Sequence, residues 1–200
     1  MKTQQRILNT ALALFNKNGE SNTSTVDIAA ELNISPGNLY YHFSSKEDII
    51  LTLIEEFEAK LSELLEMLAL SLIDILEDDL VLKSILEVTW QYRFLYRDMH
   101  AVSMRNKEIA KRLLRLRQQT EQGLSYLIES YHLEKIILIP PTYVTSVTQQ
   151  MLLLCTSWFL WLKPDLDEKL WLENEIEKTC KQMRSLLVPW LQETNEMANA

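Results

Sequence analysis

Apolar residues recur every three or four positions along most of this chain, which is the spacing of one buried face on an α-helix. The first face comprises Ile7, Leu8, Ala11, Leu12, Leu14 and Phe15. This pattern predicts a helix over about residues 2–18. Gly19 follows directly, which favours a left-handed C-terminal cap at that position.

Two short helices are predicted next, each marked by a capping residue. Ser24 and Asp27 have the spacing of a capping box, in which a hydroxyl and a carboxylate satisfy the first amide groups of a helix. That helix is expected to end at Asn33, because asparagine tolerates the left-handed conformation. Ser35 then caps a helix that runs to about residue 43, with Pro36 at its first position, where the missing N–H costs nothing.

The remainder of the chain is predicted to be helical as well. Overlapping capping boxes at residues 44–48 start a long helix that is expected to reach into the seventies. Later helices are expected from an acidic start at 77–79 through Trp90, over about 94–104, over about 107–131, from Pro140 and Pro141 to just before Pro164, and over about 167–191. With only three glycines and five prolines in 200 residues, the sequence predicts an all-α fold.

Charge divides the chain unevenly. The formal net charge is −8, which disfavours nucleic-acid binding by bulk charge. Residues 1–46 nevertheless carry four cationic and three anionic side chains, a net +1, so the acidic excess of −9 lies in residues 47–200. Any affinity of the first segment for phosphate must therefore depend on geometry, hydrogen bonds and dimerisation more than on charge.

The uncharged stretch from 136 to 162 is long enough to span a bilayer. Its prolines and its many Thr, Ser and Gln residues favour instead a helix buried in the protein or at a subunit interface. The first residues lack the continuous apolar run of a secretory signal. Cys155 and Cys180 form neither a disulfide framework nor a metal cluster, so we expect buried thiols, as in a cytoplasmic protein. We also expect no association with a membrane.

Residues 25–46 have the layout of a helix-turn-helix, whose second helix enters the major groove of DNA. Leu39 and Phe43 are four residues apart and form the inward face of that helix. The outward face then presents Gly37, Asn38, Tyr41 and His42.

The outward residues suit contact with DNA. Tyrosine hydroxyls and an imidazole can donate to phosphates or bases, Asn38 can read an adenine edge, and Gly37 lets the backbone approach closely. Thr25 and Lys46 stand at helix N-termini, where anions bind. The alternative is that Tyr40, Tyr41 and His42 pack against neighbouring helices, and Tyr40 is the most ambiguous of the three.

Three strings in this region are diagnostic together: TVDIAA at 25–30, LNISPGNLYYHF at 32–43 and SKEDI at 45–49. They strongly resemble the DNA-binding domain of the TetR family of bacterial repressors, over about residues 4–55. The resemblance implies an all-α homodimer whose divergent C-terminal domain usually binds a small-molecule inducer. It places near DNA the residues Thr25, Ser35, Gly37, Asn38, Tyr40, Tyr41, His42 and Lys46.

One position departs from the family pattern. The family often has Gly-Val-Ser at the turn, whereas this chain has Asn33, Ile34 and Ser35. Asparagine can adopt the same backbone conformation as glycine here, so the departure leaves the predicted turn intact.

Beyond residue 46 the sequence shows no glycine-rich phosphate loop, no metal-ligand spacing and no nucleophile beside a base. We therefore expect no enzyme, no cofactor and no metal site. Six cations lie within residues 105–117, and three interpretations stay open: a solvated face, a site for an anionic ligand group, or contact with the acidic segment 165–177.

Aromatic and methionine residues also cluster in this region, as either core or pocket. The pocket hypothesis draws on Trp90, Phe94, His100, Met104, Tyr126, Met151 and Cys155.

Together these patterns predict a three-helix helix-turn-helix DNA-binding domain over 1–46 and a larger helical ligand-binding and dimerisation domain over 47–200. The expected partners are double-stranded operator DNA, an unknown small-molecule effector and a second copy, joined through helices at about 142–162 and 168–191. Two rivals are an enzyme that uses the aromatic pocket and a protein-binding module that has lost DNA binding. The weak positive charge of the first segment is the best support for the second rival.

Overall fold

The computed structural model describes residues 2–70, 80–160 and 168–192. Within these ranges the chain is helical, as the sequence predicts, and its one β-type pairing is an isolated antiparallel bridge between Ile137 and Leu191. The elements are α1 (Thr3–Asn18), α2 (Thr25–Glu31), α3 (Pro36–His42), α4 (Lys46–Leu70), α6 (Leu80–Gln91), α7 (Phe94–Arg97), α8 (Met99–Arg105), α9 (Lys107–Leu133), α10 (Pro141–Ser157), α11 (Glu168–Ser185) and the 3₁₀ helix η1 (Val188–Trp190).

The chain forms two compact units, each made of two stretches of sequence. The first unit comprises Met1–Leu61 with Trp90–Gln118, and the second comprises Ser62–Thr89 with Gln119–Ala200. The chain therefore passes from one unit to the other inside α4, α6 and α9. The predicted boundary after residue 46 separates a DNA-binding domain from a ligand-binding and dimerisation domain, and it stays a prediction.

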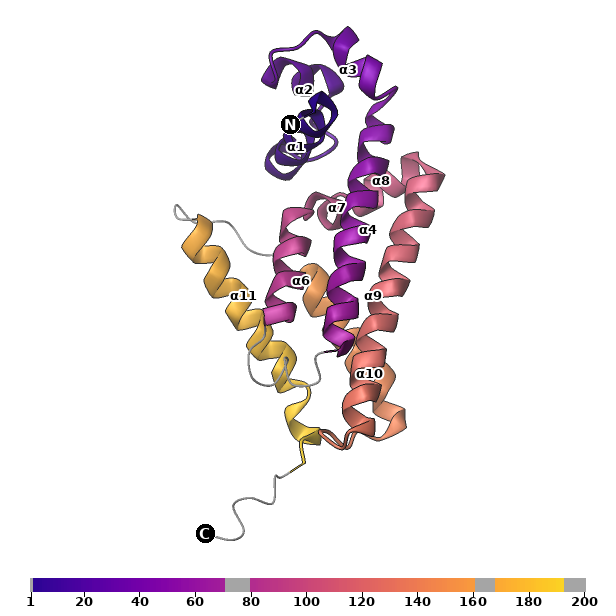
Figure 1. Cartoon of the computed structure of the whole chain (residues 1–200), viewed down its shortest axis with the longest axis vertical. Coiled ribbons are helices and arrows are strands. Elements are labelled where there is room, and N and C mark those ends of the chain that lie inside the picture. Colours follow the sequence, from indigo (N-terminus) through magenta and orange to yellow (C-terminus); the bar gives the residue numbers. More distant parts are fainter. Residues whose placement is uncertain (1, 71–79, 161–167, 193–200) are drawn as a thin grey trace. The chain divides into compact units, whose positions relative to one another are not determined.

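The first unit is built on the apolar face of α1. Five of the six side chains of α1 predicted to face inward are buried, among them Ile7 and Phe15, and Leu14 is half-buried. Phe15 packs against Phe94 of α7 with ring centroids 5.1 Å apart. A second aromatic contact stacks Phe57 of α4 on Tyr92, with centroids 5.0 Å apart. In Figure 1 the three short helices of the N-terminal region form the indigo-to-purple cluster.

Polar contacts hold the C-terminal end of α1 to the segment that follows α6. The side chain of Asn16 donates to the carbonyl of Gln91 (2.7 Å) and accepts from the backbone N–H of Phe94 (3.1 Å). The guanidinium of Arg97 donates to the carbonyls of Phe15 (2.7 Å) and Asn16 (3.1 Å). These carbonyls lie in the last turn of α1, and that of Phe15 also accepts the N–H of Gly19 (3.0 Å). Arg97 adds donors to both carbonyls and complements the helix dipole.

The predicted N-terminal caps of α2 and α3 are confirmed, whereas the predicted C-terminal cap of α1 is not. The hydroxyl of Ser24 accepts the N–H of Asp27 (3.2 Å), and the Asp27 carboxylate accepts the N–H of Ser24 (2.8 Å), which completes the capping box. Ser35 accepts the N–H of Asn38 (3.2 Å), and Pro36 is the first residue of α3. At Gly19 the φ of 89° is positive but the ψ of 149° is extended, so α1 ends without the predicted left-handed helical residue.

Later boundaries agree in part with the predicted ones. α4 begins at Lys46, after Ser45 accepts the N–H of Asp48 (3.1 Å). The acidic helix start expected at 77–79 lies outside the described residues. The single segment predicted over 94–104 is two short helices, α7 and α8, which meet at Asp98.

The prediction of one helix over 167–191 is wrong at its end. α11 stops at Ser185, and a separate 3₁₀ helix contains Pro189. A proline ring clashes with the carbonyl four residues earlier, which here belongs to Ser185, and proline has no N–H to offer it. The chain after Pro189 turns instead to pair with residues 136–138, where the N–H of Leu138 donates to the carbonyl of Trp190 (2.7 Å).

In the second unit, α4 and α9 approach closely. A Cβ added at Gly123 would lie 3.0 Å from Leu65. α10 and α11 meet at Cys155, whose sulfur lies 3.8 Å from that of Met183. Burial, with a smaller effect of Cys180, raises the pKa of Cys155 to about 12, so this thiol is protonated at neutral pH. Both cysteines are free and buried, as expected.

No helix in the described part of the chain combines the length and the apolar character needed to cross a membrane.

The capping box makes a prediction about pH. Hydrogen bonds from the hydroxyl and then the backbone N–H of Ser24 lower the pKa of Asp27 below its usual 3.8. A lowered pKa stabilises the fold above the unfolded-state value, and this contribution is lost as pH falls through the folded-state value. Asp27→Asn should therefore lower the free energy of unfolding at neutral pH, by an amount that shrinks as pH falls below about 4. Urea unfolding across this range measures it.

The control for this prediction is Glu31→Gln, which neutralises an exposed carboxylate at the other end of α2. This variant should lose no stability at neutral pH, because a negative charge near a helix C-terminus is not stabilising. An Asp27→Asn deficit that is the same at every pH would contradict the role of the ionised carboxylate.

Candidate functional site

Helices α2 and α3 form a two-helix unit joined by a tight turn. In the turn, Asn33 has a φ of 54°, the left-handed conformation predicted for it. The N–H groups of Asn33 and Ile34 donate to the carbonyls of Ala30 and Ala29, both at 3.0 Å. Leu39 on α3 is fully buried, and Phe43 directly after α3 is 5% exposed. This inward face fixes which side of α3 is presented to solvent.

The outward face of α3 is open. Tyr41 is 85% exposed and Tyr40 is 50% exposed, so the alternative in which Tyr41 packs against neighbouring helices is not observed. His42 is half-buried and makes an edge contact with Tyr41, with ring centroids 5.1 Å apart. Of the other predicted contact residues, the exposed ones are Ser35, Gly37 and Asn38.

A hydrogen bond joins the start of α2 to the outward face of α3. The hydroxyls of Thr25 and Tyr40 lie 2.9 Å apart. Two of the predicted contact residues are therefore held together, and the Tyr40 ring is fixed beside the N-terminus of α2. A hollow of about 460 Å³ lies next to this pair and is lined largely by hydroxyl groups. Its lining includes Ser21, Ser24, Thr25, Tyr40, Ser44 and Ser45.

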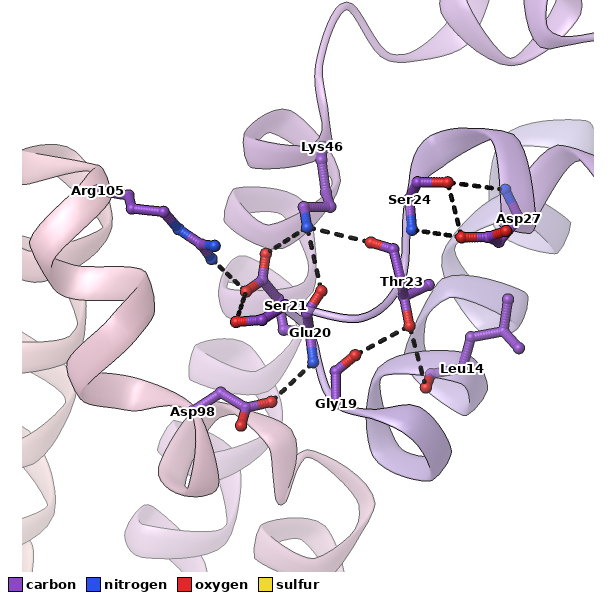
Figure 2. A network of polar contacts seen from close by, with 10 residues as sticks. All are labelled: Leu14, Gly19, Glu20, Ser21, Thr23, Ser24, Asp27, Lys46, Asp98 and Arg105. Carbon is purple, nitrogen blue, oxygen red and sulfur yellow. Dashed lines mark hydrogen bonds and ion pairs between the residues drawn. The ribbon is translucent and has the colours of Figure 1, made fainter.

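Lys46 differs from the other predicted contact residues, because its ammonium group is already engaged within the protein (Figure 2). Its Nζ atom lies 2.8 Å from a carboxylate oxygen of Glu20, and it donates to the carbonyls of Glu20 and Thr23, each at 3.1 Å. Two of its three N–H donors are therefore used by backbone carbonyls, and the contact with the carboxylate is an ion pair. In this arrangement Lys46 connects the loop after α1 to the start of α4.

The seven residues of the predicted ligand pocket are divided between the two units, and the pocket stays a prediction. Trp90, Phe94, His100 and Met104 belong to the first unit, whereas Tyr126, Met151 and Cys155 belong to the second. Four of them are buried, namely Trp90, Phe94, Met151 and Cys155. The other three, His100, Met104 and Tyr126, are exposed. Phe94 and Trp90 have partners in the first unit, the Phe15 ring and the Arg93 guanidinium respectively.

A groove of about 420 Å³ lies in the second unit between α9 and α10. None of the seven residues lines it. Its walls combine apolar groups with a carboxylate, an imidazole and two hydroxyls, from Ser125, Glu129, His132, Leu133, Ile139, Pro141, Val144 and Thr145. The Nδ1 atom of His132 is buried without a hydrogen-bond partner in the described structure. This size and composition are typical of small-molecule sites.

The basic segment 105–117 makes specific contacts, among them those of Arg105 and Arg112. Arg105 pairs with Glu20, and Arg112 pairs with Glu55 (2.8 Å) and Glu58 (3.4 Å) of α4. The segment is therefore more than a solvated face. The sequence did not single out Glu20, because a charged residue directly after a helix is ordinarily solvated. The only feature of the sequence that could have pointed to Glu20 was its charge close to the predicted end of a helix.

Two known protein families match this chain, and one of them covers α2, the turn and α3. A family described as bacterial regulatory proteins, tetR family, matches residues 7–53, and one described as bacterial transcriptional repressor matches residues 56–198. The chain belongs to the TetR family. The resemblance inferred from the sequence is confirmed, and the second match extends it over most of the chain.

Individual relatives agree with this assignment. The regulator UidR of Escherichia coli is 34% identical over 113 residues, which are 56% of this chain and 57% of that protein. QacR of Staphylococcus aureus is 41% identical over 63 residues, or 32% of this chain and 34% of its own. The chain thus spans just over half the length of UidR. These relatives are transcriptional regulators rather than enzymes, in line with the expected class.

A solved structure covers nearly the whole chain. A TetR-family transcriptional regulator from Marinobacter aquaeolei VT8 is 30% identical, with a TM-score of 0.81, over 96% of this chain and 93% of that one. The all-α architecture, with a helix-turn-helix followed by a larger helical region, is therefore the architecture of this family.

Proposed function

We propose that this TetR-family protein is a dimeric repressor that binds operator DNA through α3 and is released by a small molecule. The observation that supports DNA binding most directly is the outward face of α3, where Tyr41 is 85% exposed next to Asn38 and Gly37. A surface helix with this composition suits the major groove, where its N-terminal residues reach base edges. Thr25, Ser35, Tyr40 and the N-termini of α2 and α4 then face phosphates.

The protein acts as a dimer in this proposal because the operator has two half-sites, and each copy of α3 binds one of them. Two copies of α3 would enter successive major grooves about 34–36 Å apart on a near-palindromic operator. Large apolar side chains remain exposed on the helices predicted to form the interface: Leu153 on α10 and Leu170 on α11 are 62% and 57% exposed. Burial of these side chains against a second copy would remove them from water, which supports an interface through about 142–162 and 168–191.

Release by an effector is a shift between two populations of the dimer. A small molecule that binds the conformation with the wrong spacing between recognition helices lowers the fraction able to hold DNA. The match of residues 56–198 to a family described as repressors supports this direction of regulation. The predicted ligand residues and the domain division after residue 46 are retained here as part of the proposal.

The first test concerns the recognition face. Tyr41→Ala with His42→Ala should weaken binding to an operator selected by the wild-type protein at least tenfold, because each lost base or phosphate contact costs about 1–3 kcal/mol. Stability should change by less than about 0.5 kcal/mol for Tyr41→Ala alone, since that side chain is largely exposed. Fluorescence anisotropy and thermal unfolding measure the two quantities.

Leu114→Ala is the matched control for this test, because Leu114 is also exposed (55%) but lies on α9. It should bind the operator as the wild-type protein does. Undiminished binding by the double variant would show that α3 is not the reading helix.

The second test concerns the interface. Leu153→Asp should convert the dimer to a monomer and weaken operator binding, because a charge in an apolar contact is desolvated without a partner. Light scattering after size exclusion gives the mass. Leu114→Asp makes the same change on α9 and should leave the dimer intact. A Leu153→Asp protein that stays dimeric would exclude α10 from the interface.

The third test concerns the effector. A compound that raises the unfolding temperature of the DNA-free protein should also weaken operator binding, since it stabilises the form that cannot hold DNA. Tyr126→Ala, at a side chain that is 57% exposed, should reduce the affinity for that compound and leave the fold unchanged. Compounds that stabilise the protein yet never change its affinity for DNA would argue against release by a small molecule.

A further inference from the structure

The carboxylate of Glu20 is fully buried between two cations of the first unit (Figure 2). Lys46, the first residue of α4, lies 2.8 Å from one carboxylate oxygen. Arg105, the last residue of α8, pairs with the other oxygen. The backbone N–H of Glu20 donates to Asp98 (2.8 Å), and the Ser21 hydroxyl lies 3.5 Å from the oxygen that Arg105 contacts. The single buried carboxylate of Glu20 therefore pairs with two cations, Lys46 and Arg105.

The two cations are not equivalent. Lys46 is 20% exposed; it donates to two backbone carbonyls and forms an ion pair with Glu20. Arg105 is 45% exposed and has donors beyond those that reach Glu20. A DNA phosphate near the start of α4 would compete with Glu20 for the Lys46 ammonium group, whereas Arg105 can stay where it is.

The energetic problem lies with the carboxylate that Lys46 would leave behind. A buried ion that loses its partner is strongly destabilised, because the desolvation of its charge is no longer offset. Glu20 avoids this only because Arg105 remains on its second oxygen. The pairing of Arg105 with Glu20 thus lowers the cost of moving the Lys46 ammonium group from the loop to a phosphate.

We propose that Arg105 is a positioning residue for DNA binding: it holds the charge of Glu20, and this frees Lys46 to contact phosphate. The inference rests on the proposed binding of operator DNA. It assigns to α8 a contribution to affinity that involves no contact between α8 and the DNA. It also reconciles the predicted role of Lys46 with the ion pair that its ammonium group forms with Glu20 in the structure.

The test measures operator affinity as a function of salt concentration. The probe is a duplex selected from a random pool by the wild-type protein. Each phosphate contact made by a cation contributes about 0.9 to the slope of log affinity against log salt. In Arg105→Met, Lys46 should stay with Glu20, so the slope should fall by about 2 for a dimer and the affinity by on the order of tenfold.

A second background separates positioning from direct contact. In Glu20→Gln there is no carboxylate to hold Lys46, so adding Arg105→Met should change neither slope nor affinity further. An equal loss in both backgrounds would show that Arg105 itself touches DNA or only supports the fold. No loss in either would also overturn the proposal.

Two further variants keep the result decisive if the double variant does not fold. Arg105→Lys retains the charge and should retain the wild-type slope, whereas Arg105→Gln should behave as Arg105→Met does. Equal slopes for these two would contradict the proposal. A wild-type protein that selects no duplex would instead reject the proposed operator binding, which is a distinct outcome.

Discussion

The attachment of the end of α1 to the segment after α6 is the contact on which the first unit depends. Phe15 packs on Phe94, and the Asn16 side chain bonds to the backbone of Gln91 and Phe94. The guanidinium of Arg97 donates to the last carbonyls of α1. These contacts join residues about eighty positions apart in the sequence. The helix-turn-helix is packed on α1, so its position is set through this attachment. A shift of residues 90–105 cannot occur without disturbing the last turn of α1 or the loop that follows it.

Local signals explain why the helices of the N-terminal region could be predicted from sequence. The capping pair of Ser24 and Asp27, and Ser35 followed by Pro36, act through atoms within three residues of each other. Asn33 adopts positive φ because its own side chain tolerates that conformation. The recognition face followed from helical periodicity alone, since burial of Leu39 leaves Tyr41 outside. The end of α11 was also locally encoded, in Pro189, and the prediction failed there because it gave periodicity more weight than the proline.

The parts that could not be predicted depend on contacts between distant residues. Nothing adjacent to Glu20 in the sequence marks it as buried, because Arg105 lies 85 residues away and Lys46 lies 26 residues away. Whether an aromatic residue belongs to the predicted ligand set also depends on such contacts. Aromatic and methionine side chains favour an apolar environment, which either a core or a ligand pocket can provide. Phe94 packs on Phe15 in the core of the first unit. Only the three-dimensional arrangement distinguishes a side chain that fills a core from one that lines a site.

The small charge of residues 1–46 has a consequence for how such a regulator would find its site. Chromosomal DNA offers millions of competing positions, and a protein's residence on them is set by its cationic contacts with phosphate. With a net charge of +1, residues 1–46 attract the phosphates of arbitrary DNA sequences only weakly. Few copies of the protein would be bound to non-operator DNA, and the search for the operator would proceed by three-dimensional diffusion more than by sliding along DNA. A low cellular abundance would then suffice to keep an operator occupied.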